Sequence, residues 1–478
     1  MNEIMSSDLN KFVGVDFHVH TPASQCYKGS KTDSEYIEIL RRYVEKEVKV
    51  IAITDHNTLK GYRKLKEIEK EYINKLKYLS ELSEKYPVIK TEYEQVKSKL
   101  ELFSKLLILP GIEFEANPGV HLLLIFSPEC DLSKVESFLI EAGYTDEVQG
   151  KEDPGIVPKC DVLSVLNEAS SLGALVIAPH ADSNKGIYNS LPKNQYRANV
   201  FRSNNLNAIS YNNPITCQKM KVMLKNKEYK RESPVAFIQC SDYHGDDEAA
   251  TCITYLKLEE LDFESVCDAL KNPNECVSPT QHPKIINILK QIINDHKSFV
   301  FENLENDEDI SLIKRAVCAI LNDGYGTLVI GAARNPEINI IGISMDKKDI
   351  LNILKDIFKS IKPTTFSVQI TGYEYGRNRH VIVVQLAREN NTISYIDDND
   401  VYILKNNQII KANPTLIEKI VEDRIFKRIV EHQKIINNKY KHIIREIELV
   451  YCIIKMDKVA KEIPHFCNRK FPNIAKGH

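Results

Sequence analysis

Short apolar runs alternate with amphipathic segments along roughly the first 280 residues of the chain. Seven of these runs have the length and the Val, Ile and Leu content of strands, and most of the segments between them place apolar residues at helical spacing. This alternation indicates βα units around a mainly parallel sheet, so the predicted class is α/β. The expected strands cover residues 14–19, 48–54, 106–113, 120–126, 174–178, 208–211 and 235–240.

A long polar segment interrupts this pattern between about residues 59 and 105. It is rich in Lys, Glu, Leu and Tyr, its apolar residues recur at helical spacing, and Pro87 lies in its second half. Because proline interrupts a helix, we expect two helices folded back on each other. The alternative is a coiled coil that binds a partner.

A Pro-, Asn- and Ser-rich stretch at residues 272–283 predicts a domain boundary. The pattern after it indicates a smaller α+β domain, and from residue 414 onward it is helical with many Lys and Arg. The predicted domains are therefore 1–280, 281–412 and 413–478. In the second domain we expect helices at 285–295, 310–322 and 347–361, and strands at 326–333, 365–373, 379–387 and 400–404.

Composition indicates the class of protein and its cellular compartment but does not point to a substrate. The 478 residues are 43% hydrophobic and 27% charged, with a formal net charge of -2, as in an ordinary globular protein. Eleven cysteines without a CxxC pair are typical of reduced thiols in a cytosol. The sequence has neither a leader-like amino terminus nor a long uninterrupted apolar run. We therefore expect a cytoplasmic protein that does not associate with a membrane.

Histidines and carboxylates follow the expected strands at the points where the strands end. His18 and His20 are two residues apart on the first strand, so both imidazoles can face one ion. Asp55 and His56 follow the second strand, and Glu113 ends the third. In barrel enzymes, such strand ends carry the catalytic groups.

The same arrangement recurs further along the chain. His121 opens the fourth strand, His180 follows the fifth, and Asp242 and His244 follow the last. Taken singly, each group could be a hydrogen-bonded core residue or part of a loop. Polar groups that converge from five strand ends would be costly to bury without an ion, so together they predict a metal centre.

These motifs resemble those of a known family. DFHVHT, TDHN, GIE, PHAD and SDYH, in this order, are similar to the motifs of the PHP family, which is named for bacterial DNA polymerases and histidinol phosphatases. The resemblance covers about the first 280 residues and implies a distorted seven-stranded (β/α) barrel that binds two or three Mn, Fe or Zn ions and hydrolyses phosphate esters. The metal ligands that it implies are His18, His20, His56, Glu113, His121, His180, Asp242 and His244.

The resemblance also implies catalytic roles. The cations would ionise a water and clamp the phosphate oxygens, and His180 or His244 would act as general acid for the leaving oxygen. Asp242 completes the ligand set at the reacting centre. We group Asp55 with these catalytic residues as a support for His56.

One position departs from the family pattern. Many family members have His or Asp five or six residues beyond the His-x-His motif, where this chain has Gln25 and Cys26. Either one ion is held more loosely, or Cys26 is a softer ligand that favours Zn or Fe over Mn. The third interpretation is an ordinary loop thiol.

Basic residues between positions 185 and 231 are candidates for phosphate contacts. If they flank the mouth of the barrel, they offer several contacts to a nucleic-acid backbone. The alternative is a solvated helix face. The expected substrate-binding residues are Arg197, Arg202 and Lys185.

The second domain carries another resemblance. The pattern AVCAILNDGYGTLVIGAARN at 316–335, followed by INIIGIS, resembles the Alba-like domain of Schlafen-type proteins over about residues 299–410. This resemblance implies nucleic-acid binding. Where family members often carry a Glu-Phe-Lys element, this chain has FENLENDED, so we expect the domain to bind nucleic acid and not to cut it.

Together, the two resemblances predict a metal-dependent nuclease that hydrolyses phosphodiester bonds, with a role in phage defence or nucleic-acid processing by analogy. Two alternatives stay open. One is a phosphatase or phosphodiesterase that acts on a small nucleotide; the other is a metal-stabilised subunit that binds nucleic acid or assembles without catalysis. The basic carboxy-terminal segment predicts either self-association or binding to a partner protein or nucleic acid.

Overall fold

The computed structural model describes residues 11–83, 86–152, 155, 157–245, 249–334, 337–389, 392–396, 399–406 and 408–470. The chain divides into two compact units. The larger comprises Met1–Ser311, Gly326–Lys355 and Val368–Gln385, and the smaller comprises Leu312–Tyr325, Asp356–Ser367 and Leu386–His478.

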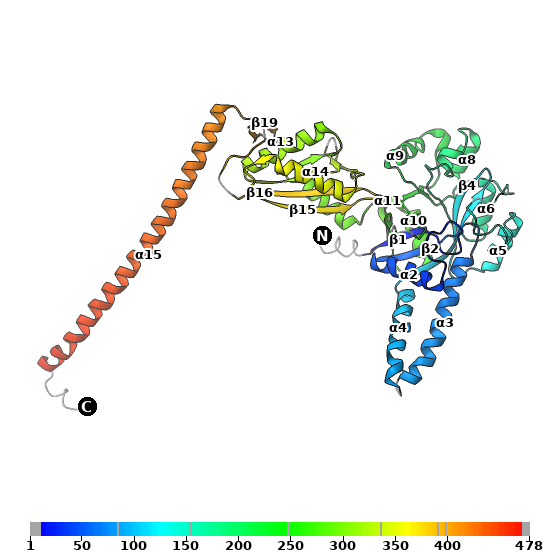
Figure 1. The fold of residues 1–478 in the computed structure, drawn as a ribbon, viewed down its shortest axis with the longest axis horizontal. Coiled ribbons are helices and arrows are strands. Elements are labelled where there is room, and N and C mark those ends of the chain that lie inside the picture. Colours follow the sequence, from blue (N-terminus) through cyan, green and yellow to red (C-terminus); the bar gives the residue numbers. More distant parts are fainter. Residues whose placement is uncertain are drawn as a thin grey trace. The chain divides into compact units, whose positions relative to one another are not determined.

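A nine-stranded sheet forms the core of the larger unit (Figure 1), with the strand order β7-β6-β5-β4-β3-β2-β1-β8-β9. An isolated bridge joins Val19 of β1 to Tyr243, which follows β7, so the sheet is nearly closed into a barrel. The predicted α/β barrel class is confirmed, with nine strands in place of seven because two short strands extend the sheet beyond β1. The strands are β1 (Phe12–Val19), β2 (Val48–Ile53), β3 (Leu107–Ala116), β4 (Val120–Ile125), β5 (Leu175–Ala178), β6 (Ala208–Ser210), β7 (Ala236–Ile238), β8 (Thr254–Lys257) and β9 (Val277–Ser278).

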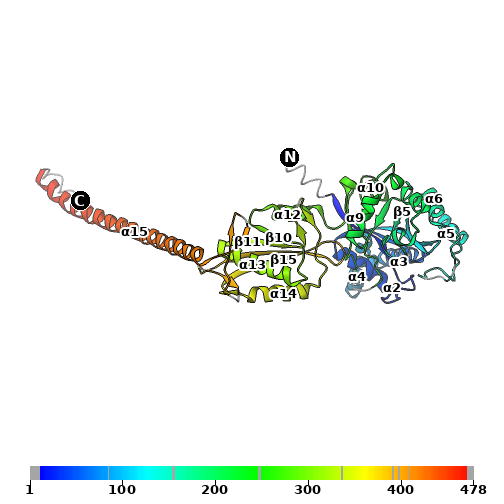
Figure 2. The same ribbon diagram turned by 90° about the horizontal axis from the view of Figure 1, so that it is seen from above.

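Helices connect the strands, and Figure 2 shows α5, α6 and α10 around the sheet. Asp131, Asp161 and Asp262 cap these three helices by accepting a hydrogen bond from a backbone N–H of the first turn. The helices are α2 (Asp33–Glu45), α3 (Lys60–Ser83), α4 (Pro87–Ser104), α5 (Leu132–Glu141), α6 (Val162–Ser171), α7 (Ile187–Ser190), α8 (Gln195–Arg202), α9 (Pro214–Met223), α10 (Phe263–Lys271) and α11 (Pro273–Cys276).

Strand direction decides which strand ends meet. β1, β2 and β3 pair in parallel, as do β5, β6 and β7, whereas β4 is antiparallel to both of its neighbours. The start of β4 therefore lies at the same edge as the ends of the other six strands. His121, the second residue of β4, reaches this edge because its strand is reversed.

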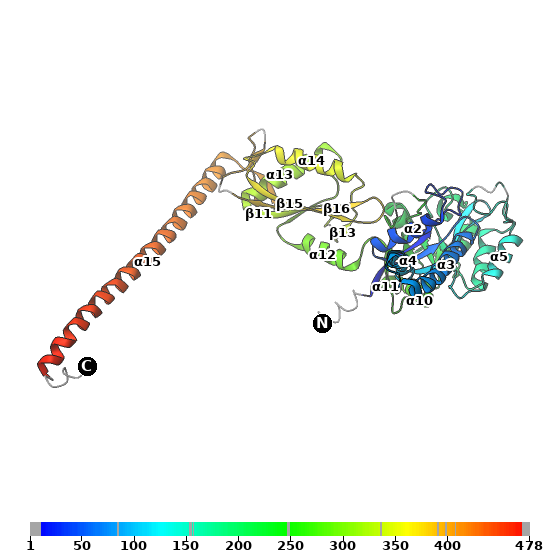
Figure 3. The ribbon, with the colours of Figure 1, turned by 60° about the horizontal axis from the view of Figure 1, so that its bottom comes forward.

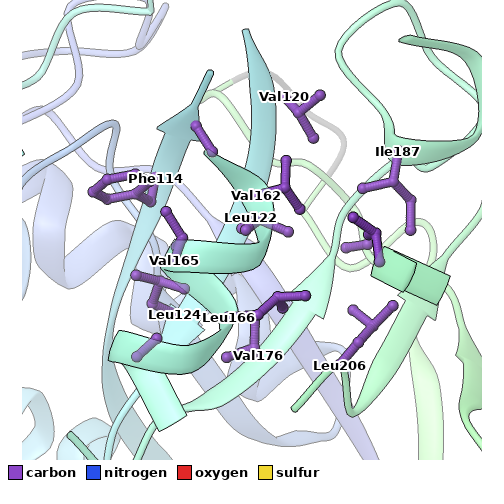
Figure 4. Packing of buried hydrophobic residues seen from close by; sticks show 14 of the residues in the cluster. Phe114, Val120, Leu122, Leu124, Val162, Val165, Leu166, Val176, Ile187 and Leu206 are labelled. Atoms are coloured by element: carbon purple, nitrogen blue, oxygen red, sulfur yellow. The ribbon is translucent and has the colours of Figure 1, made fainter. Parts of the chain in front are cut away.

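Apolar side chains cover both faces of the sheet. Leu123 and Leu124 are neighbours on β4 but belong to different buried clusters, as the alternation of side chains along a strand requires. Leu124 packs in one cluster with Val165 and Leu166 of α6 (Figure 4). On the opposite face, Leu123 shares a cluster with Val15, Phe17 and other strand residues.

The segment between β2 and β3 forms the expected helical hairpin. Its helices, α3 and α4, lie side by side and project from the barrel (Figure 1). Pro87 begins α4, where its missing N–H and fixed φ cost the helix nothing.

The rest of the larger unit contains most of a four-stranded sheet with the order β10-β11-β16-β15. Leu289 and Ile293 of α12 pack against Val329 and Val381, and Figure 3 shows α12 along one face of this sheet. The single strand predicted at 326–333 is interrupted at Gly331, whose φ of 98° suits only glycine. The elements of this part of the chain are α12 (Pro283–Asn294), β10 (Ser298–Phe301), α13 (Asp307–Asp323), β11 (Tyr325–Ile330), β12 (Ala332–Ala333), β13 (Asn339–Ile340), α14 (Lys347–Lys359), β15 (Phe366–Glu374) and β16 (His380–Arg388); most of α13 belongs to the smaller unit.

Asn322 organises the smaller unit. Its side-chain amide donates to the carbonyls of Ser394 and Tyr402 at 2.7 and 2.9 Å, and its side-chain oxygen accepts from the Ser394 N–H at 2.8 Å. These bonds tie α13 to the residue before β17 (Tyr395–Ile396) and to the start of β18 (Tyr402–Lys405). β17 pairs with β14 (Ile361–Lys362) and β18 pairs with β19 (Gln408–Lys411), and α15 (Pro414–Lys470) follows them. Within the described ranges, no helix combines the length and apolar character needed to cross a bilayer.

Candidate metal centre

One edge of the barrel gathers all eight predicted metal ligands. His18 and His20 lie at the end of β1, His56 after β2, Glu113 on β3 and His121 at the start of β4. His180 follows β5, and Asp242 and His244 follow β7. Segments that are more than 200 residues apart in the sequence therefore contribute to one cluster.

Glu113 is the centre of this cluster. Its Oε1 lies 2.7 Å from His121 Nδ1 and 3.1 Å from His180 Nε2. Its Oε2 lies 3.0 Å from His56 Nδ1, 3.2 Å from His18 Nε2 and 3.3 Å from His20 Nε2. One buried carboxylate thus approaches five imidazole nitrogens, and its two oxygens can contact different cations.

The ligand atoms form three overlapping sets that include Glu113 or Asp242, and a fourth set that includes the sulfur of Cys26. Within each set, all ligand atoms lie within 4.8 Å of one another, close enough to share an ion. The sets are His18–His20–Glu113, His18–His180–Asp242, His56–Glu113–His121 and His20–Cys26–His56–His244.

Several buried atoms of the cluster fit cations better than hydrogen bonds. Glu113 Oε2, His56 Nε2 and His121 Nε2 are buried without a hydrogen-bond partner, although imidazole nitrogens lie within 3.3 Å of the carboxylate oxygen. His18 Nε2 and His20 Nε2 are only 3.1 Å apart. Because unpaired polar atoms are costly to bury, this donor set of imidazoles and carboxylates fits divalent cations such as Zn, Fe or Mn.

The hydrogen bonds behind two ligands direct their lone pairs toward the cluster. Ser24 donates its hydroxyl proton to Asp55 at 2.6 Å, so its oxygen accepts from His20 Nδ1 at 3.0 Å. His244 Nδ1 donates to the carbonyl of Asp242 at 2.8 Å. In both rings the proton is thereby held on Nδ1, which leaves Nε2 as a ligand atom.

The charges of the cluster shift the pKa values of its members. Burial opposes ionisation of Glu113, but the neighbouring His121, His18 and His56 hold its pKa well below its usual range. Burial also opposes ionisation of Asp242, but the neighbouring His18 and His20 hold its pKa well below its usual range. Both carboxylates are therefore ionised, as metal ligands must be.

Two ligands have backbone conformations that residues other than glycine rarely adopt. His180 has a φ of 28° and Asp242 a φ of 56°. Such strain persists only where the surrounding structure imposes it, and it clusters at functional sites. Here it turns both side chains back toward the cluster at the ends of β5 and β7.

Asp55 supports the ligands and is not presented to the cavity. Its carboxylate accepts from the N–H and hydroxyl of Thr21 at 2.8 and 2.7 Å and from Ser24, and it is fully buried. These contacts suit a positioning role, which acts on His20 through Ser24. Asp16 has a similar role that the sequence did not reveal: it accepts from Tyr43 at 2.9 Å and from Ser241, one residue before Asp242.

A cavity of about 520 Å³ opens above the cluster. The predicted Lys185 lines it, and so do Asn212 and Arg377, which the sequence analysis did not single out. Arg377 belongs to the same compact unit and donates to Asn212 Oδ1 at 2.5 Å. No local signal marks Arg377, because it lies in a turn between two strands of the second sheet, far along the chain from every metal-ligand motif.

The other two predicted substrate contacts do not line this cavity. Arg197 is only 3% exposed, and its guanidinium lies 4.6 Å from the ring centroid of Tyr188. Arg202 is exposed and donates to Asn199, on its own helix. Their substrate role stays a prediction that this cavity does not support, because a charged residue in a helical pattern does not reveal which way the helix faces.

The fold and the cluster define a mixed α/β protein whose barrel-like sheet carries a metal-ligand site. Residues 293–413 match the family model described as Schlafen, AlbA_2, which confirms the predicted Alba-like domain. Among curated proteins, none matches the sequence significantly.

Several solved structures resemble the chain. The lesion-specific endonuclease PfuEndoQ from Pyrococcus furiosus is 14% identical, with a TM-score of 0.37, over 55% of this chain and 56% of its own. A two-domain protein from Bacteroides vulgatus that contains a predicted PHP-like metal-dependent phosphoesterase is 11% identical, with a TM-score of 0.34, over 85% of this chain and 97% of its own. PsfC from Pseudomonas syringae is 14% identical, with a TM-score of 0.34, over 59% and 98%. The chain thus spans little more than half the length of the endonuclease.

Proposed function

We propose that the barrel is a PHP-type metal-dependent phosphoesterase and that its substrate is a phosphodiester of nucleic acid. The observation that carries this proposal is Glu113, a single buried carboxylate within 3.3 Å of five imidazole nitrogens at the open edge of the barrel. Six histidines and two carboxylates provide enough ligands for two or three divalent cations.

The ligands and the residues of the cavity wall would have different roles in hydrolysis. Glu113 and Asp242 would hold the cations, and the histidines would complete the ligand sets. When bound, such cations supply positive charge that favours ionisation of a water at neutral pH and neutralises the phosphate oxygens. Lys185 and Arg377, on the wall of the cavity, can bind the remaining phosphate oxygens by charge-assisted hydrogen bonds.

Two observations favour nucleic acid over a small nucleotide. Asn212 and Arg377 line both the cavity above the cluster and an adjoining groove of about 870 Å³. None of the residues that line this groove is acidic, and five are basic: Lys219, Lys221, Lys290, Arg377 and Arg379. A groove of this charge can hold the backbone beyond the scissile phosphate. The AlbA_2 match at 293–413 supports the same substrate class. The proposed pathway, phage defence or nucleic-acid processing, rests only on the domain pairing.

The test is hydrolysis of labelled single- and double-stranded DNA and RNA oligonucleotides beside a panel of mononucleotides, each with Mn and with Zn. We expect cleavage of at least one oligonucleotide class. Cleavage of the mononucleotides alone would replace the nuclease with a small-nucleotide phosphoesterase. No turnover of any substrate by protein that carries its metal ions would reject catalysis and leave a binding or assembly subunit.

Replacing Arg377 by alanine is expected to lower kcat/KM for an oligonucleotide about 10- to 100-fold, because a hydrogen bond to a charged group contributes roughly 1.5–3 kcal/mol. Steady-state kinetics on the same oligonucleotide measure the effect. Arg202→Ala is the matched control, because its guanidinium is exposed and lines neither cavity. Equal kinetics of Arg377→Ala and wild type would contradict the contact.

A further inference from the structure

We propose that Cys26 is a metal ligand and that, with His56 and His244, it forms a cation position that prefers thiophilic ions such as Zn, Fe(II) or Co(II) to Mn or Mg. This inference rests on the metal centre of the proposed function but not on its substrate. It concerns a thiol that no other part of the proposed function uses.

The sulfur lies among ligand atoms and not among ordinary loop contacts. Cys26 Sγ and the ligand nitrogens of His20, His56 and His244 all lie within 4.8 Å of one another. The rings of His20 and His244 are stacked with their centroids 4.1 Å apart, so their nitrogens are presented side by side. Cys26 forms no disulfide with any described cysteine.

A second observation points to a cation at this position. His56 Nε2 is buried without a hydrogen-bond partner, and the other nitrogen of the same ring faces Glu113 at 3.0 Å. His56 is therefore oriented by Glu113 through one ring nitrogen, and its other nitrogen stays unpaired inside the site. An unpaired imidazole nitrogen in a buried site is costly unless it binds an ion.

The loop that carries Cys26 is fixed on both sides. The N–H of Gln25 donates to the Gly150 carbonyl at 2.6 Å, and the N–H of Lys28 donates to the His244 carbonyl at 2.7 Å. The second bond ties the loop directly to one of the proposed ligands. The thiol is thus held at the site before any ion binds, which lowers the cost of ordering it.

The ligand chemistry separates this position from the other three ligand sets. His20 can serve either this position or the one it shares with His18 and Glu113. In both cases Cys26, His56 and His244 remain, and three protein ligands with an open place are typical of catalytic zinc sites. Cys26 would bind an ion as a thiolate and no carboxylate belongs to this set, whereas each of the other sets includes Glu113 or Asp242, so only this position should discriminate strongly for soft ions.

The test is titration of the metal-depleted full chain with Co(II), followed by absorption spectroscopy and an elemental count of bound ions. We expect a near-ultraviolet thiolate-to-cobalt charge-transfer band in the wild type. The band should be lost in Cys26→Ser together with about one ion per chain. Cys160→Ser is the matched control, because Cys160 is also half-buried but lies outside every ligand set, and this variant should keep the band.

A second variant separates ligation from damage to the fold. Cys26→Asp keeps a ligand but makes it hard, so it should keep the ion count and lower the Zn-over-Mn preference about 10- to 100-fold in competition experiments. Ions bound without a charge-transfer band, or an unchanged preference in Cys26→Asp, would overturn the role of Cys26 and leave the metal centre standing. A chain that binds no ion at all would overturn both.

Independently, we infer from α15 that the protein pairs with a second copy of itself through a parallel two-stranded coiled coil. Phe426, Ile429, Gln433, Ile436 and Tyr440 follow one another at alternating spacings of three and four residues. The four apolar members are 67, 51, 48 and 62% exposed, so the described part of the chain does not cover them. In the sequence, the spacing continues with Ile or Val at positions 443, 447, 450 and 454.

We call this row of positions, from Phe426 to Ile454, the seam of α15, and its pattern indicates that the partner is an identical helix. An apolar repeat of 3.5 residues over about four heptads is the pattern of a left-handed coiled coil, not of a helix packed on a globular surface. The only polar residue of the seam is Gln433, and two such side chains meet only when the copies are parallel and in register. The alternative partner of this basic helix, nucleic acid, would contact its Lys and Arg residues instead.

Light scattering coupled to size exclusion on nuclease-treated full chain tests this pairing. The wild type should have twice the mass of the chain, and the double variant Ile429→Asp with Ile436→Asp should have the mass of one chain. The matched control carries Lys427→Asp and Lys434→Asp, which have the same spacing on another helix face, and it should stay dimeric. A monomeric or trimeric wild type, or a dimer that only the lysine variant disrupts, would overturn the inference.

Discussion

Replacing Glu113 by glutamine is expected to remove most of the bound metal and to lower hydrolysis by a factor of about a thousand or more. Glutamine has nearly the same shape, but it is neutral, and an amide nitrogen replaces one of the two carboxylate oxygens. The five imidazole nitrogens that now converge on a carboxylate would lose the anion that two ligand sets share. Elemental analysis of the purified variant and kinetics at saturating metal measure the two effects.

Glu129→Gln provides the control for this change. Glu129 is exposed in a loop and belongs to no ligand set, so the variant should keep the metal content and activity of the wild type. Far-ultraviolet circular dichroism should show that both variants are folded. A Glu113→Gln variant with full metal content and full turnover would reject the assignment of the cluster as the reacting centre.

Removing the cations with a chelator is expected to abolish hydrolysis and to lower the thermal midpoint of the barrel by roughly 5–10 °C. The ligands come from strand ends between His18 and His244, so the unfolded chain cannot assemble the site and the ions bind only the folded state. Each site held at about 100 times its dissociation constant contributes roughly 2.7 kcal/mol. Differential scanning calorimetry before and after chelation, and after Zn or Mn is added back, measures the shift.

Comparison with the Glu113→Gln variant makes this experiment specific. If the stabilisation comes from ions in the cluster, the chelator should shift the midpoint of this variant much less than that of the wild type. Equal shifts in both proteins would place the stabilising ions elsewhere. Unchanged midpoints in both would mean that hydrogen bonds alone hold the cluster together.

Local signals in the sequence were sufficient for the strands and for the kinds of ligand. Each of β1 to β7 is a short apolar run, and residue types that bind cations stand at or near the ends of five of them, as with His56 after β2 and His180 after β5. The insertion was equally visible, because helical spacing and Pro87 are properties of neighbouring residues. β8 and β9 could not be predicted, because strands of four and two residues are too short to show a periodic pattern.

The roles of individual charged residues depended on contacts that no local pattern contains. Asp55 stands beside a ligand in the sequence, but its carboxylate accepts hydrogen bonds from Thr21 and Ser24. Arg377 lies 133 residues beyond the last ligand, His244, and yet lines the cavity above the cluster. Arg197 has the charge for a phosphate contact but is buried beside Tyr188.

The sequence by itself determined that this protein has an α/β fold with His, Asp and Glu at its strand ends, because strand periodicity and ligand chemistry are both local. Only the tertiary structure decided that these ends meet. The reversal of β4 brings His121 to the same edge as Glu113, and the pairing of β1 with its distant neighbours brings Cys26 beside His56 and His244. Strand direction and pairing arise from contacts between residues far apart in the chain, and a pattern along one segment does not contain them.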